Sequence, residues 1–336
     1  MTDLTNPIFT DADKARDHLE TLRWPKGPVC PHCGATDHHV SKVESSGKKT
    51  KEAYKGGKHR PARKGLYSCN SCNEQFTVQV GTVLEKSHIP LNKWLAGFYL
   101  MCASKKGYSA HQLHRTLGIS YKSAWFMAHR IREAMRAGGL LGPMGGGGEV
   151  VEVDETTIGR RKGIPSKRAM RKEDTIRGST STKNIVLSLV QRDGSVRSFH
   201  VAATTVAELV PIIKANISRE AQLMTDEASW YKSLNWGGDF ASHDKVNHIR
   251  GEYVRYQDIG PVITPNTVEG YFSIFKRGMK GVYQHCSEKH LHRYLAEFDF
   301  RYSNRVKLGV DDTERTNRAI RNSIGKRLTY RRTNEV

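Results

Sequence analysis

The chain has 336 residues, and 54 Lys and Arg against 34 Asp and Glu give it a formal charge of +20. This length is sufficient for two or three domains with real hydrophobic cores. The charge favours a polyanion as partner, with nucleic acid ahead of an acidic membrane surface. The sequence excludes a transmembrane protein, because it has no apolar run of about 18 residues and no signal-peptide pattern at residues 1–4. It therefore predicts an intracellular, cytoplasmic protein associated with the nucleoid.

The N-terminal region, residues 1–24, predicts one short amphipathic helix over residues 10–24 with Asp11 as a possible cap. A module at residues 25–86 follows, and a strand is expected over residues 76–80. Within it, residues 38–66 are rich in Lys, Arg, Gly and Ser, which indicates a basic loop. That loop either contacts DNA phosphates or serves only as a solubilising insertion, and the net charge favours phosphate contact.

Four of the six cysteines in the chain form two Cys-x-x-Cys pairs within that module. They are Cys30, Cys33, Cys69 and Cys72. Two such pairs supply the four thiolates of a closed, tetrahedral zinc site, so we expect one structural Zn²⁺ in a zinc ribbon. A redox role is the alternative, and four thiols in one small module disfavour it. The other two cysteines, Cys102 and Cys286, are expected to be small buried hydrophobic residues.

Residues 87–137 are helical in pattern, with helices expected from residue 90 to about 103, from 108 to 117, and from 121 to about 136. The second and third flank a Leu-Gly-Ile-Ser turn, and the third is basic. This arrangement is typical of a helix-turn-helix whose last helix reads a major groove, although any small helical bundle offers the same pattern. The glycine-rich segment 138–148 indicates a linker and a domain boundary.

The pattern then changes to that of an α/β domain, expected over residues 149–305. Strands are predicted at residues 150–154, 184–191, 196–201 and 222–226, and helices at residues 205–218 and 265–278. Three strands, a helix, a strand and a helix resemble the order in ribonuclease H, a mixed sheet with flanking helices. Residues 159–177 are expected to form a basic hairpin or loop over DNA, and residues 306–336 a basic tail or a frayed helix.

The helix from Pro265 to Gly278 carries Asn266, Glu269 and Lys276 in one narrow polar stripe. One interpretation is that Asn266 caps the helix and Glu269 closes a capping box. The other is that Glu269 binds a metal ion and Lys276 contacts phosphates. On this helix alone the capping interpretation is the stronger one.

Two carboxylates upstream in the chain make the metal-binding interpretation the stronger one. Asp154 and Asp226 each end a predicted apolar strand, where a carboxylate projects toward a shared crevice. Either alone is readily explained as a surface residue in a turn. Together with Glu269 they predict a cluster of three acids that binds two Mg²⁺ or Mn²⁺ ions for phosphodiester chemistry.

These residues carry a resemblance to insertion-sequence transposases that join an N-terminal zinc ribbon to a DDE catalytic domain. The matching motifs run in order through most of the chain. They are Leu22-Arg23-Trp24, Cys30-Pro31-His32-Cys33-Gly34, Cys69 and Cys72, Phe76-Thr77-Val78, Gly81-Thr82-Val83, Leu91-Asn92-Lys93-Trp94, Val153-Asp154-Glu155, Thr225-Asp226, Val246-Asn247-His248, Glu252-Tyr253-Val254, Asn266-Thr267-Val268-Glu269-Gly270, Lys276-Arg277-Gly278, and Arg293-Tyr294-Leu295 to Phe300-Arg301-Tyr302.

The resemblance implies that Asp154 and Asp226 are the first two catalytic acids. Members of the family have Asn or Glu at the third position, so both Asn266 and Glu269 are candidates, and the trailing lysine of the family falls on Lys276. The implied activity is to bind the terminal inverted repeats of an element, cleave its ends and join the 3′ ends to double-stranded target DNA, as a homo-oligomer. The alternatives are a transposase-derived DNA-binding regulator that no longer cuts and a metal-dependent, structure-specific nuclease.

Overall fold

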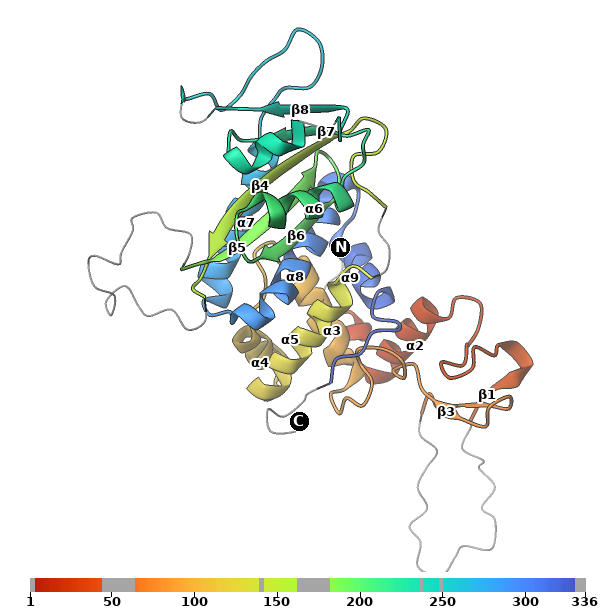
Figure 1. The fold of residues 1–336 in the computed structure, drawn as a ribbon. Helices are drawn as coiled ribbons and strands as arrows, with labels where there is room; N and C mark the ends of the chain where they lie inside the picture. Colours follow the sequence, from red (N-terminus) through yellow and green to blue (C-terminus); the bar gives the residue numbers. More distant parts are fainter. Residues whose placement is uncertain are drawn as a thin grey trace, which may run out of the picture. The chain divides into compact units, whose positions relative to one another are not determined.

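The computed structural model describes residues 4–43, 64–138, 142–161, 182–235, 238–247 and 250–329 (Figure 1). The chain divides into two compact units. The first contains residues 1–100, 110–134 and 316–336, and the second contains residues 101–109 and 135–315. The two predicted basic loops lie largely outside the described residues, which omit residues 44–63 and 162–181.

The first unit begins with two helices, α1 (Pro7–Thr10) and α2 (Ala12–Arg23), where the sequence predicted one. The break falls at Asp11, which has extended backbone angles and caps α2, as expected. Its carboxylate accepts the backbone N–H of Asp13 at 2.7 Å. The helix predicted over residues 10–24 is therefore present as α2, and α1 is an additional helical turn before it that the sequence analysis did not predict.

The ribbon is a three-stranded antiparallel sheet of β1 (Val40–Lys42), β2 (Tyr67–Cys69) and β3 (Gln75–Phe76). The ring of Tyr67 stacks on that of Phe76 at 5.7 Å, and Trp24 meets both edge-on. The prediction that the last strand runs to residue 80 is wrong, since β3 ends at Phe76 and residues 78–80 form a turn.

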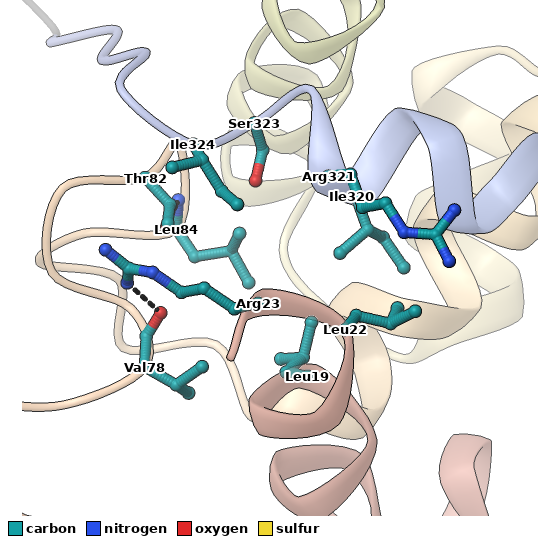
Figure 2. Close-up of a pocket in the computed structure, with 10 residues that line it drawn as sticks. All are labelled: Leu19, Leu22, Arg23, Val78, Thr82, Leu84, Ile320, Arg321, Ser323 and Ile324. Carbon is teal, nitrogen blue, oxygen red and sulfur yellow. Dashed lines mark hydrogen bonds between the residues drawn. The ribbon is translucent and has the colours of Figure 1, made fainter. Parts of the chain in front are cut away.

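Arg23 explains this early end. Its Nη1 donates to the carbonyl oxygen of Val78 at 2.6 Å (Figure 2). It also donates to that of Val80 at 2.7 Å, so these groups pair with the end of α2 instead of a strand. The residues drawn in Figure 2 enclose a cavity of only about 20 Å³. Such a volume holds a single water molecule, and the cavity is therefore a packing gap, not a ligand site.

The helical region of the chain contains α3 (Leu91–Ala103), α4 (Ala110–Leu117) and α5 (Tyr121–Met135) at the predicted places. Gly118 has a φ of 58°, a left-handed conformation that glycine adopts without strain, and it turns the chain after α4. The Ser120 hydroxyl then accepts the backbone N–H of Ser123 at 3.1 Å, and so caps α5.

The second unit is built on a five-stranded mixed sheet in the order β6-β5-β4-β7-β8 (Figure 1). The strands are β4 (Val150–Ile158), β5 (Asn184–Gln191), β6 (Val196–Val201), β7 (Gln222–Thr225) and β8 (Ser242–Lys245). β5 pairs antiparallel with β4 and β6, whereas β7 is parallel to both β4 and β8. The sequence predicted four of these strands. It did not predict β8, whose Ser-His-Asp-Lys sequence lacks apolar residues.

Helices cover both faces of the sheet: α6 (Val206–Asn216), α7 (Asn266–Gly278) and α8 (Leu291–Ser303). Side chains alternate between the faces, as strand geometry requires. Odd-numbered residues of β4 and β5, such as Val153 and Leu187, pack against α6. Even-numbered residues, such as Val186, pack against α7 and α8. Because β5 is buried on both faces, it reads as a continuous apolar run.

The C-terminal segment is more ordered than the predicted basic tail. It contains α9 (Asp312–Arg321), in which Ala319 and Ile320 are buried. Short helices connect several of the main elements. They are the 3₁₀ helices Asp37–His39, Ser229–Asn235, Glu288–His290 and Val306–Leu308, and the π-helix Met279–Tyr283. Among the described residues, no helix is long and apolar enough to cross a lipid bilayer.

Candidate active site

The four predicted zinc ligands lie together at one end of the ribbon. The Sγ atoms of Cys30 and Cys72 are 3.7 Å apart and those of Cys33 and Cys69 are 3.6 Å apart. All four sulfur atoms lie within 4.8 Å of one another. Zinc–sulfur bonds of about 2.3 Å in a tetrahedron place the sulfurs about 3.8 Å apart. The ribbon therefore fits a structural Zn²⁺.

The strand register brings Asp154 and Asp226 to the same end of the sheet. Glu152 of β4 is the register partner of Met224 in the parallel strand β7, and each aspartate lies two residues further along its own strand direction. Two residues are one pleat repeat, so both carboxylates point to the α7 face of the sheet. The prediction that Asp154 ends its strand is wrong, because β4 continues to Ile158 in its pairing with β5. Asp226 does follow directly after the end of β7.

A buried carboxylate attaches α7 to the same face. Glu152 is fully buried, and its Oε2 accepts the backbone N–H groups of Thr267 at 2.7 Å and Val268 at 2.9 Å. Its Oε1 accepts the Thr267 hydroxyl at 2.8 Å and the Nε of Arg192 at 2.6 Å. The free N–H groups and positive dipole end of a helix favour an anion at this position. Glu152 lies two residues before Asp154 in β4, so its hydrogen bonds hold the start of α7 close to that aspartate.

Arg192 completes this attachment from the opposite side. Its Nη1 donates to the carbonyl oxygen of Val262 at 2.7 Å, and its Nη2 to that of Thr264 at 2.9 Å. One guanidinium therefore holds both the carboxylate that caps α7 and the backbone that leads into the helix. We call Glu152 and Arg192 the clamp. The sequence analysis missed both residues, although an acid within the apolar run Val-Val-Glu-Val was a signal for a paired buried charge.

The clamp rules out the capping-box interpretation of α7. The N-cap residue is Pro265, one position earlier than predicted, and proline has no backbone N–H for Glu269 to accept. Asn266 is the first helical residue and is exposed. Glu269 is also exposed, and the described residues provide no hydrogen-bond partner for its carboxylate. It is therefore available for another role.

Electrostatic interactions link Glu269, as well as Glu155 and Asp226, to Asp154. Burial raises the pKa of Asp154 well above its usual range, and the negative charges of Glu155, Asp226 and Glu269 raise it further. Burial also raises the pKa of Glu155 to about 7; the charge of Asp226 adds to this rise, and a hydrogen bond from the Tyr231 hydroxyl opposes it. A chain with a net charge of +20 thus concentrates four acids in one place.

The acids are grouped more loosely than the cysteines. Across the described ranges, the cysteine cluster alone brings three or more ligand atoms within 4.8 Å of one another. Lys276 lies half-buried seven residues after Glu269 on α7. The structure does not place Asn266 or Lys276 in contact with the aspartates.

Removing the Glu152 carboxylate is expected to destabilise the second unit strongly. Glu152→Ala leaves Arg192 without its buried partner and two helix N–H groups without an acceptor, which costs about 3–5 kcal/mol. Urea unfolding followed by tryptophan fluorescence measures this loss. The matched control is Glu208→Ala, on the exposed side of α6, with an expected change within about 0.5 kcal/mol. A loss below about 1 kcal/mol in Glu152→Ala would show that the clamp does not hold α7.

Comparison with known proteins finds one match for the zinc ribbon and a second match for the α/β domain. Residues 10–75 match the transposase zinc-ribbon domain, and residues 145–303 match the ISXO2-like transposase domain. The chain is therefore an insertion-sequence transposase by class. It belongs to the family that joins an N-terminal transposase zinc ribbon to an ISXO2-like transposase domain.

A curated relative agrees with this assignment. It is an uncharacterized protein in transposable element ISH50 of Halobacterium salinarum, and it is 26% identical to this chain over 302 residues. The match covers 87% of this chain and 91% of that protein. No solved structure is significantly similar to the chain.

Proposed function

We propose that the protein is an active DDE transposase that binds the ends of its element, cleaves them and joins the 3′ ends to target DNA. The observation that supports the proposal is that Asp154 and Asp226 come from neighbouring parallel strands and that the charges of Asp226 and Glu269 act on Asp154. Asp154 lies in β4, Asp226 follows β7, and Glu269 is in the first turn of α7. All of them lie within the stretch that matches a transposase domain.

The sheet supports a ribonuclease H-like catalytic domain. Its first three strands in the chain form an antiparallel meander, and the fourth and fifth are added on the other side of the first, parallel to it. In this arrangement the first strand is central, and the fourth lies beside it. Asp154 and Asp226 therefore come from neighbouring parallel strands, where carboxylates can share a ligand.

The proposed cofactor at the acids is Mg²⁺ or Mn²⁺. Hard divalent cations prefer carboxylate oxygens, and a pair of ions supplies an activated water or 3′-hydroxyl and stabilises the leaving oxygen. Asp154 and Asp226 would hold the ions from the sheet, and Glu269 would complete the set from α7. Asn266, one turn earlier, is the alternative third ligand through its amide oxygen. Lys276 would contact a phosphate beside the scissile bond.

Double-stranded DNA is the proposed partner, as element terminal inverted repeats and as target. The charge of +20 supports contact with phosphates, and α4 and α5 supply a helix, a glycine turn and a basic helix in the order of a helix-turn-helix. We propose a DNA-binding region at residues 87–137, between the ribbon at 25–86 and the catalytic region at 149–305 in the chain. The active complex is proposed to be a homo-oligomer.

The direct test is a strand-transfer reaction. Protein, Mg²⁺ and labelled duplex from the element ends are incubated with a supercoiled plasmid, and the junctions are sequenced. We expect 3′ ends of the element joined to the plasmid. Cleaved ends without joined products would support a nuclease instead. Bound but uncleaved ends would support a DNA-binding regulator.

A further inference from the structure

The pairing between the two strands that lead to Asp154 and Asp226 stops before it reaches them. β4 and β7 are neighbours in the sheet (Figure 1), and among the described residues their register pairs end at Glu152 and Met224. Beyond these residues β4 continues in its pairing with β5, and β7 in its pairing with β8. The pairing sets the register and facing of the two aspartates, and a contact beyond it is needed to hold their carboxylates at a fixed distance.

Each aspartate carboxylate accepts a hydrogen bond from a backbone N–H group close to it in the chain. The Oδ1 atom of Asp154 accepts the N–H of Glu155 at 2.7 Å. The Oδ1 atom of Asp226 accepts the N–H of Ala228 at 3.0 Å. The orientation of the two carboxylates therefore depends on the backbone segments that contain Glu155 and Ala228.

Glu155 and Tyr231 join these two segments. The Tyr231 hydroxyl donates to the Oε2 atom of Glu155, and the backbone N–H of Tyr231 donates to the carbonyl oxygen of Ala228 at 3.1 Å. Tyr231 is only 1% exposed, so packing also holds its hydroxyl in this contact. A continuous path of hydrogen bonds therefore runs from Asp154 to Asp226 through the three residues between them.

Glu155 lies on the opposite face of the sheet from the proposed metal site. Successive residues of a strand point to opposite faces, so Glu155 points toward α6 and Asp154 toward α7. Tyr231 agrees with this placement, because it packs in the same hydrophobic cluster as Val153 of β4 and Leu209 of α6. Glu155 therefore acts on the site through the backbone beside Asp154, and not as a further ligand.

We propose that Glu155 and Tyr231 are positioning residues, which together form a strut that sets the separation of the Asp154 and Asp226 carboxylates. The inference rests on the proposed function, because it assigns a task to residues that support the proposed metal ligands. A hydrogen bond from a hydroxyl to a carboxylate is shorter and stronger than one between neutral groups, so it suits a contact that must hold a distance. Replacing residues that orient metal ligands typically lowers metal affinity or activity about 10–100-fold.

Tyr231→Phe tests the strut, because it removes one hydroxyl and keeps the ring. Full-length, zinc-loaded protein is titrated with Mn²⁺, the free ion is measured by electron paramagnetic resonance, and strand transfer is measured at saturating Mn²⁺. We expect Tyr231→Phe to bind Mn²⁺ at least about tenfold more weakly than the wild type and to transfer strands more slowly. The matched control is Tyr283→Phe. Tyr283 also donates to a buried carboxylate, that of Glu297, but it lies in the π-helix after the end of α7, so this variant should bind Mn²⁺ like the wild type.

Two variants of Glu155 separate positioning from a direct role of its carboxylate. Glutamine keeps an oxygen that accepts the Tyr231 hydroxyl, so Glu155→Gln should bind Mn²⁺ within about threefold of the wild type. Glu155→Ala removes the acceptor and should match Tyr231→Phe. A loss as large in Glu155→Gln as in Glu155→Ala would make the charge of Glu155 the feature that matters and overturn the strut.

The same measurements separate failure of the strut from failure of the proposed function. Circular dichroism identifies any variant that does not fold, and Tyr231→Phe decides the question if Glu155→Ala is one of them. If the wild type binds Mn²⁺, equal affinity and strand transfer in Tyr231→Phe and Tyr283→Phe would overturn the strut and leave the proposed function standing. A wild type that binds no Mn²⁺ would overturn the proposed function, and the strut with it.

Discussion

Replacing Asp154 or Asp226 by asparagine is expected to lower cleavage and strand transfer about a hundred- to a thousandfold or more, because each removes a charged ligand of the proposed metal pair. DNA binding should remain, since the phosphate contacts lie on basic side chains elsewhere. The measurement is the strand-transfer reaction beside a gel-shift titration with the same element-end duplex. Activity retained within about tenfold in both variants would remove these acids from the mechanism.

The same variants give a test that does not use activity. The folded-state pKa of Asp154 is raised, so the folded protein holds this proton more tightly than the unfolded chain. The free energy of unfolding therefore falls as the pH rises from the unfolded pKa through the folded one. Asp154→Asn removes this cost, and its Tm at neutral pH without divalent ions should equal or exceed that of the wild type. Added Mg²⁺ should raise the Tm of the wild type but not that of the variant.

Glu269→Gln and Asn266→Ala identify the third ligand. Because Pro265 precludes a capping box, Glu269→Gln should leave stability nearly unchanged, and loss of activity then reports ligand loss alone. We expect Glu269→Gln to be inactive and Asn266→Ala to be active. The reverse result would assign the ligand to Asn266. Activity in both would remove the start of α7 from metal binding.

Loss of zinc is expected to produce the largest change in stability. In small zinc modules, metal binding contributes about 10–16 kcal/mol, and most of it is folding energy. Cys69→Ser or chelation should therefore unfold the ribbon, residues 25–86, while the mixed sheet stays folded. Zinc content by mass spectrometry and limited proteolysis measure the effect. Cys286→Ser, outside the ribbon, is the control, and full zinc content in Cys69→Ser would contradict the four-cysteine site.

The sequence predicted those elements whose signal is local. The spacing of the thiols predicted the four zinc ligands, and runs of apolar residues predicted β5, β6 and α6. Prediction from the sequence failed for elements whose formation depends on tertiary contacts. β8 has no apolar pattern and forms because β7 offers an unpaired edge, and β3 ends early because Arg23 takes the carbonyl groups that follow it. α9 lies in a segment whose basic composition concealed its buried face.

The candidate site shows the same division. Asp154, Asp226 and Glu269 were identifiable from the sequence as candidate acids, and in the structure the charges of Asp226 and Glu269 act on Asp154. Their role as metal ligands stays a prediction. The clamp was not identifiable, because Glu152 and Arg192 meet α7 only through a contact between residues more than seventy positions apart in the chain. The start of α7 was predicted to within one residue, but its cap was not, because the cap comes from β4 and not from the helix's own sequence.

The parallel register between β4 and β7 has an evolutionary consequence. The relative position of the two aspartates is set by backbone pairing, in which Glu152 faces Met224, and not by the length of chain that connects the strands. The chain between β4 and β5 can therefore vary in length without altering the acids. A single-residue insertion or deletion inside β4 or β7 would turn one aspartate to the opposite face of the sheet. Divergence within the family should therefore vary loop length freely and keep the length of these two strands constant.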